Sequence, residues 1–146
     1  MYAAYNLWAN KRMVSTLTKV DKELLDRPVK SSFTTLRKTL YHIWDAEQIW
    51  LARLSRKSLN YFPSSKLEEP VEITATLKSS EMLLEFVKQR NDDQLGEVCK
   101  YSNTKGKEFV QINFQILIHV FNHSSFHRGQ IVTILRSLGV DNIPST

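Results

Sequence analysis

The residues best suited to chemistry lie in one stretch, HVFNHSSFHRGQI, which runs from His119 to Ile131. Three of the chain's 4 histidines lie there, His119, His123 and His127, at positions i, i+4 and i+8. On a helix, residues four apart share a face about 6 Å apart along the axis, so two such imidazoles can bind one metal ion. All three cannot, because His119 and His127 would be about 12 Å apart. A metal site therefore needs two neighbouring histidines here and a ligand from elsewhere, and the remaining histidine is His42.

Helical phase selects the inward pair. An unbroken apolar stripe at helical period places His123 and His127 in its middle and His119 at its edge, nearer solvent. The stripe consists of Ile116, Val120, His123, His127, Ile131, Ile134 and Leu138. Two adjacent histidines would be costly to bury without partners, and one metal would satisfy both. The alternative is a pair of core histidines that hydrogen-bond to their neighbours.

Composition indicates an ordinary globular protein. A length of 146 residues suits one domain, 1-146, with a sizeable core, and 42% apolar and 24% charged residues are typical of soluble proteins. No apolar run approaches the ~18 residues that span a bilayer, so we expect no membrane partner. The N-terminal segment lacks a signal-peptide profile, and the single Cys99 fits a reducing compartment. These features predict a cytoplasmic protein.

The net charge of +5 raises the question of nucleic-acid binding. The basic residues are spread along the chain, acidic residues lie among them, and no nucleic-acid motif is present. A generally solvated, mildly basic surface explains the charge, and we expect no nucleic-acid partner.

Periodicity predicts four helices, over about 2–20, 35–55, 72–90 and 114–138. Connections 21–33 and 56–71 separate the first three, and residues 97–111 are predicted to form a short hairpin with Asn103 and Gly106 in its turn. Gly139 is expected to cap the last helix. The fold class is therefore all-α: a four-helix bundle with a short β-hairpin before the last helix. Because long connections permit parallel neighbours, an up-down-down-up order is expected.

Two polar residues interrupt the apolar stripes. Asn10 lies in the first helix, and either a structural hydrogen bond or a place in a polar pocket around a metal would explain it. Glu47 lies in the second helix and needs a partner, for which a structural salt bridge with Arg12 or Arg128 is favoured over catalysis. His42 lies on a flanking stripe, with the small Ala46 one turn later, so phase alone gives it little support as a ligand.

The last helix has a second apolar face. A helix that is apolar on two sides is either central in its fold or shared with another subunit, and no helix of a four-helix bundle is central. This face predicts a homodimer packed partly through the last helix. Its residues are Phe114, Leu117, Ile118, Phe121, Val132 and Leu135.

Three segments together resemble the DinB-like (DinB/YfiT) family of metal-dependent enzymes. They are YNLWAN at 5–10, LYHIWDAEQIWLARL at 40–54 and HVFNHSSFHRGQI at 119–131, and their order and spacing cover nearly the whole chain. The resemblance implies an up-down-down-up four-helix bundle, commonly dimeric. It also implies one divalent metal per chain, zinc or nickel, held by His42, His123 and His127, whereas His119 is not a family ligand.

Relatives of this kind include S-transferases that use low-molecular-weight thiols, so the resemblance implies a small-molecule thiol as a partner. Three imidazoles on a metal leave an open position, which is typical of catalytic rather than structural sites. The metal would make a bound thiol or water more acidic. A metal-dependent hydrolase and a non-enzymatic metal-binding stress protein are the alternatives. Gln130 could orient His127, and Arg128 could hold an anionic thiol or make a structural pair.

Overall fold

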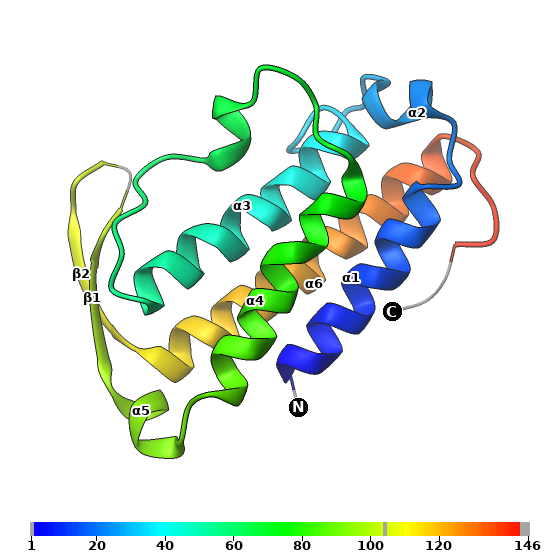
Figure 1. Cartoon of the computed structure of the whole chain (residues 1–146). Helices are drawn as coiled ribbons and strands as arrows, with labels where there is room; N and C mark the ends of the chain where they lie inside the picture. Colours follow the sequence, from blue (N-terminus) through cyan, green and yellow to red (C-terminus); the bar gives the residue numbers. More distant parts are fainter. Residues whose placement is uncertain (1, 104, 144–146) are drawn as a thin grey trace.

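In the computed structural model, which describes residues 2–103 and 105–143, four long helices form a bundle. In chain order they are α1 (Tyr2–Leu17), α3 (Leu36–Leu54), α4 (Leu77–Lys88) and α6 (Asn113–Ser137). Figure 1 shows that α1 and α6 run in one direction and α3 and α4 in the other. The predicted four-helix bundle, with its up-down-down-up order, is confirmed.

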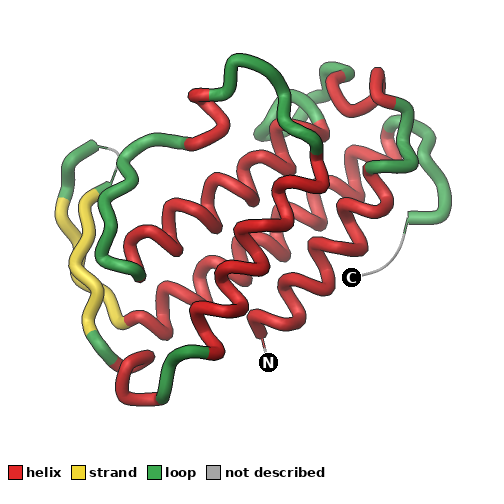
Figure 2. Tube along the Cα trace, viewed as in Figure 1, coloured by secondary structure: helices red, strands yellow, loops and turns green. Residues whose placement is uncertain are grey.

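Each helix packs on one parallel and one antiparallel neighbour. α3 contacts α6 and α4, and α1 contacts α4 and α6. The parallel pair α3 and α4 is possible because the chain between them is long enough to return along the bundle (Figure 2). That crossover contains two short 3₁₀ helices, η1 (Pro63–Lys66) and η2 (Ile73–Thr76).

The structure corrects several predicted boundaries. α4 begins at Leu77 rather than near 72, because residues 73–76 form η2. Two short helices were missed, α2 (Lys22–Asp26) and α5 (Asp92–Gly96). Both begin at capping side chains, Asp21 and Asn91, that accept a hydrogen bond from a backbone N–H of the first turn. Five residues are too few to show a helical period, so only the caps could have revealed them.

The predicted hairpin is present. Strands β1 (Val98–Ser102) and β2 (Glu108–Ile112) pair antiparallel, with Val98 opposite Ile112 and Ser102 opposite Glu108. In its turn Gly106 has a positive φ of 78°, which glycine adopts without strain. α6 follows β2 directly, so the hairpin fixes where the last helix starts.

Two helices end in the same left-handed motif with different residues. At the end of α6, Gly139 has φ 78° and the N–H of Val140 donates to Leu135 O. At the end of α3, Arg56 has φ 58° and the N–H of Lys57 donates to Ala52 O. Glycine is the usual residue at this position because a side chain is strained there. The expected cap at Gly139 is confirmed. At the end of α3 the equivalent left-handed position is occupied by Arg56, which has a long side chain.

The bundle core consists of two apolar clusters. One lies at the end where α1 finishes and includes Met13, Leu17, Leu36 and Ile131. The other lies near the hairpin and includes Leu83, Phe86, Ile116 and Val120. Buried polar side chains lie between them along the helices: Asn6, Asn10, Glu47, Ser79, Ser80 and Arg128. The chain therefore places a polar layer at mid-height in the bundle.

Candidate metal centre

Three histidines from two helices meet at mid-height, between α3 and α6. The Nε2 atom of His123 lies 2.9 Å from Nε2 of His42 and 3.1 Å from Nε2 of His127. One ring nitrogen from each lies within 4.8 Å of the others. The structure thus brings together the three residues predicted as ligands, although His42 and His123 are separated by 81 positions in the sequence.

Aromatic side chains hold the rings in place. Phe33, just before α3, stacks on His42 with ring centroids 4.2 Å apart and meets His127 edge-on at 5.6 Å. Phe126 also meets His127 edge-on, at 5.1 Å. The flanking position of His42 on α3, which gave it little support from phase, points its ring at α6 because α3 and α6 are neighbours.

A hydrogen bond fixes the tautomer of His127. Its Nδ1 lies 2.7 Å from Oε1 of Gln130, which only accepts, so Nδ1 donates and Nε2 carries a lone pair. Gln130 therefore orients the ring as proposed from the sequence. Nδ1 of His123, by contrast, is buried without a hydrogen-bond partner among the described residues.

Burial keeps the three rings neutral. It lowers the pKa of His42 to about 4 and that of His123 to about 3, and the neighbouring histidines add to both shifts. Burial also lowers the pKa of His127, while the hydrogen bond to Gln130 opposes the shift. Neutral imidazoles have lone pairs to share, whereas imidazolium rings at this spacing would repel one another.

This donor set fits a divalent metal. Three imidazole nitrogens that converge without enough protons to bond one another are better satisfied by a cation than by themselves. The His127–Gln130 bond is the outer contact that metal-binding histidines usually make. The three residues could hold one metal ion and leave a coordination position open.

A cleft of about 770 Å³ adjoins the site at His42. Phe33, Tyr41, Phe62 and Leu67 contribute its apolar walls, and Arg37, Lys38, Glu68 and Glu69 also line it. Because His42 is part of the wall, a molecule in the cleft would lie beside the histidines.

His119 is separate from the three. Its side chain is exposed and meets Trp50 edge-on, with ring centroids 5.4 Å apart. Its ring centroid lies 5.9 Å from that of His123, and it is not among the histidines whose nitrogens converge. The prediction that it lies nearer solvent is confirmed.

Glu47 belongs to a different cluster. Oε1 accepts from the amides of Asn6 at 2.7 Å and Asn10 at 2.9 Å. Oε2 accepts from the hydroxyls of Ser79 and Ser80. The favoured salt bridge with Arg12 or Arg128 was wrong, since neither forms an ion pair with Glu47.

Arg128 reaches Glu47 only through the amides. Its Nη1 donates to Asn10 Oδ1 at 2.8 Å and to Asn6 Oδ1 at 3.1 Å, and its Nη2 donates to Ser125 Oγ. Asn10 thus has the structural role that was one of its two interpretations. We refer to Asn6, Asn10, Glu47, Ser79, Ser80 and Arg128 as the Glu47 network; it joins all four long helices.

Sequence reasoning missed Asp45. Its two oxygens accept from the backbone N–H and the hydroxyl of Ser64, so it anchors η1 of the crossover onto α3. Burial raises its pKa, and the bonds from Ser64 oppose the shift. Asp45 lies three residues after His42 and is 3% exposed. In the sequence, an aspartate between Trp44 and Ala46 of an apolar helix was the signal that could have revealed it.

A family model covers the entire chain. The model of the DinB family matches residues 1–146. The chain belongs to the DinB family. A curated relative, Protein DinB of Bacillus subtilis strain 168, is 27% identical over 97% of this chain and 86% of its own length.

Solved DinB-like structures share the fold. A DinB-like protein of Bacillus cereus has a TM-score of 0.70 at 17% identity and covers 99% of this chain and 95% of its own. YjoA of Bacillus subtilis has a TM-score of 0.73 at 14% identity and covers 99% of this chain and 96% of its own. YfiT of Bacillus subtilis has a TM-score of 0.71 at 13% identity and covers 96% of this chain and 87% of its own. It is described as a probable metal-dependent hydrolase with an unusual four-helix bundle topology.

Proposed function

We propose that this member of the DinB family is a metal-dependent enzyme that transfers a low-molecular-weight thiol to an electrophile. The convergence of three neutral histidine nitrogens beside an apolar cleft is the observation that carries the proposal. His42, His123 and His127 would hold one divalent metal per chain, with zinc and nickel the first candidates because imidazole suits both. When bound, the metal supplies Lewis-acid chemistry that makes a coordinated thiol or water more acidic.

The protein's own groups divide the work. Gln130 holds the Nδ1 proton of His127, which keeps Nε2 free to coordinate. Phe33 covers the His42 ring and limits the access of water to it. The cleft beside His42 offers apolar walls on which the electrophile can lie.

The two buried carboxylates of α3 support a thiol over water as the nucleophile. Asp45 and Glu47 follow His42 on α3, and every oxygen of both accepts a hydrogen bond. A water nucleophile benefits from a general base close by, whereas a thiol is acidic enough to lose its proton on coordination. Neither carboxylate of α3 is free to act as that base, and a water mechanism would have to use Glu68 or Glu69 of the cleft instead.

Metal content tests the site first. Protein purified without a metal-affinity tag should contain near one divalent metal per chain, and His123→Ala should lose it. His119→Ala, which removes the neighbouring exposed histidine, is the matched control and should retain the metal. Wild-type protein that is metal-free and binds neither zinc nor nickel on titration would overturn every enzymatic assignment.

A metal-dependent hydrolase is the second candidate. The description of YfiT as a probable metal-dependent hydrolase favours it, together with the shared fold. The two candidates differ in their need for thiol. The transferase consumes an added thiol in step with its electrophile, whereas a hydrolase turns over ester or amide substrates at the same rate without one. A protein that binds metal but has neither activity would fit the third alternative, a non-enzymatic metal-binding stress protein.

We further propose a homodimer packed through α6. Phe114, Ile118 and Phe126 are 52%, 39% and 63% exposed along this helix, more apolar surface than an isolated bundle helix needs. The inner part of the second apolar face, Leu117, Phe121 and Leu135, is buried within the protomer, so only its edge is available. Sedimentation should show a dimer that Ile118→Glu dissociates; a monomeric wild type would exclude it.

None of the described helices has the length and apolar character to cross a lipid bilayer. We place the protein in the cytoplasm because its single Cys99 is a free thiol, buried beside Arg53 O, as expected in a reducing compartment.

A further inference from the structure

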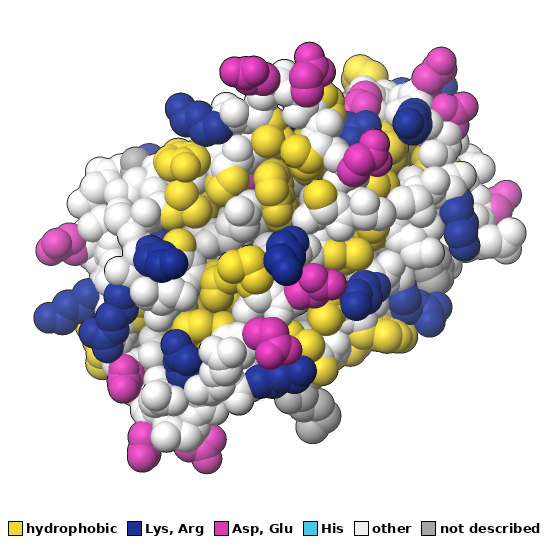
Figure 3. All heavy atoms as spheres, viewed as in Figure 1, with side chains coloured by type: hydrophobic (Ala, Val, Ile, Leu, Met, Phe, Trp, Pro, Cys, Tyr) yellow, Lys and Arg dark blue, Asp and Glu magenta, His cyan; other side chains and the backbone are white. Residues whose placement is uncertain are grey.

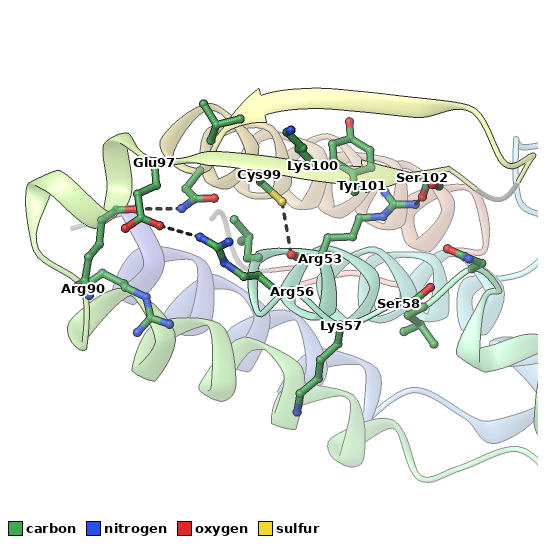
Figure 4. Close-up of a pocket in the computed structure, with 16 residues that line it drawn as sticks. Arg53, Arg56, Lys57, Ser58, Arg90, Glu97, Cys99, Lys100, Tyr101 and Ser102 are labelled. Carbon is green, nitrogen blue, oxygen red and sulfur yellow. Dashed lines mark hydrogen bonds and ion pairs between the residues drawn. The ribbon is translucent and has the colours of Figure 1, made fainter.

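A second cavity, of about 800 Å³, lies at the hairpin end of the bundle. It is bounded by the end of α3, the segment after α4 and strand β1 (Figure 4). Five cationic side chains and one carboxylate, Glu97, line it, against a net charge of +5 for the whole chain. The cations are Arg53, Arg56, Lys57, Arg90 and Lys100. Figure 3 shows Lys and Arg side chains on the surface beside the hairpin.

Helix dipoles account for part of this charge. α3 and α4 run in parallel, so both carboxyl ends point toward this cavity, and cations near a helix C-terminus offset the dipole. Arg56, Lys57 and Arg90 follow those ends. Dipoles do not require that a guanidinium be buried, and they do not explain Lys100, which lies on β1.

Arg53 is a buried cation without a counter-ion. It is 9% exposed, and within the described part of the chain no carboxylate forms an ion pair with it. Its guanidinium carbon lies 4.6 Å from the ring centroid of Trp50 and 4.7 Å from that of Tyr101, and only Nη2 donates, to Ser102 O at 3.2 Å. Nε is buried without an acceptor. A buried, unpaired charge destabilises the fold unless an anion compensates it.

Arg56 is held in a conformation that favours glycine. With φ 58° it occupies the position that Gly139 occupies at the end of α6. Its guanidinium reaches Glu97, where Nη2 lies 3.0 Å from Oε2 (Figure 4). That pair is exposed, with 79% and 51% of the two side chains accessible, so it contributes little to stability. An arginine at a position where glycine is less strained points to a use for its charge.

We propose that this cavity binds a small anion that carries two or more phosphate charges. Arginine forks bind phosphate oxygens in pairs, and Arg53, Arg56 and Arg90 supply three forks, two from the end of α3 and one from the segment after α4. Arg53 itself lines the cavity, so an anion bound there would compensate its buried charge. The cavity is distinct from the histidine site: its lining contains none of the three histidines.

Pyrophosphate, titrated by calorimetry at low ionic strength, tests the proposal. We expect one saturable site and a shift of the Arg53 Nε–H resonance. Arg56→Gly should weaken binding about tenfold, the value of one charge-assisted hydrogen bond, without lowering the melting temperature because glycine suits the left-handed position. Glu97→Gln should tighten binding by about threefold, since it removes the competing carboxylate and frees Arg56.

Two controls locate the anion. Lys78→Gln removes an exposed charge from the first turn of α4 and should leave the affinity unchanged. His123→Ala should also leave the affinity unchanged. Weaker binding in that variant would show that pyrophosphate binds a metal at the histidines instead of the cavity. The absence of saturable binding would overturn the proposal. So would equal weakening by Lys78→Gln, or a single-stranded oligonucleotide that shifts the same resonance at lower concentration than pyrophosphate.

Discussion

Two polar clusters lie side by side in this bundle, and adjacent residues of α6 belong to them: His127 to the histidine site and Arg128 to the Glu47 network. In the network each oxygen of Glu47 accepts hydrogen bonds, and the amides of Asn6 and Asn10 link it to Arg128. In the histidine site three nitrogens face one another, and His123 Nδ1 has no partner. In the first cluster the carboxylate and the two amides find all their partners within the cluster, and only Arg128 Nε has none, whereas the three converging nitrogens of the second cluster have only one another.

The difference separates structure from function. A buried polar network that satisfies its members specifies how helices pack, because any other arrangement leaves groups unpaired. A cluster whose lone pairs converge gains from a ligand. Adjacent residues serve these two roles because consecutive side chains of a helix point about 100° apart, one toward α3 and the other toward α1.

The largest effect is expected in the network. Arg128→Ala should lower the free energy of unfolding by about 3–5 kcal/mol, because it removes a side chain that is 2% exposed and leaves the carbonyls of Asn6 and Asn10 without their donor. Chemical denaturation measures it, and Arg136→Ala, exposed on the same helix, should stay within about 0.5 kcal/mol. Folded Arg128→Ala should keep its metal; a folded but metal-free variant would show that the two clusters are not independent.

A smaller effect is expected from the group that orients His127. Gln130→Ala removes the acceptor at 2.7 Å and should weaken metal binding about 10–100-fold without loss of the fold. Competition with a chelator of known affinity measures it. Gln115→Ala, on an exposed position of α6, is the matched control. An unchanged affinity would mean that Gln130 only fills space beside the ring.

The pH dependence of metal-free protein gives the next contrast. The folded pKa of His123, about 3, lies below the ordinary value of 6.5, so below pH 6.5 the unfolded chain binds a proton that the folded chain does not. This contribution therefore lowers stability as pH falls from 6.5 toward 3. His123→Gln should gain about 1 kcal/mol relative to wild type between pH 7 and 5, a value reduced for the ring's partial solvent access. If the free energies of unfolding of the two proteins, measured against pH, changed in parallel, the contribution assigned to His123 would be refuted.

The smallest effect is expected at His119. His119→Ala should leave the metal content unchanged, because its exposed ring contacts Trp50 rather than the convergent nitrogens. Any cost should be limited to that aromatic contact, about 0.5–1 kcal/mol. A loss of metal from this variant would mean that His119 is a fourth member of the metal site. The position of His119 at the edge of the apolar stripe would then not separate it from His123 and His127.

The sequence by itself determined which side chains could serve as ligands and which elements carry them. The spacing of His123 and His127 follows from the helical period, and a local periodicity can be read from a local stretch. The four long helices, the hairpin and the glycine cap of α6 are likewise local features. The short helices α2 and α5 were not predicted, because five residues are too few to show a helical period.

Only the tertiary structure decided which distant side chains meet. His42 lies on a flank of its helix, and the packing of α3 on α6 turns that flank toward His123. Glu47 was expected to pair with an arginine, yet four uncharged side chains, from α1 and α4, satisfy it. Partner choice depends on the distances and angles between packed helices, which no period within one helix specifies.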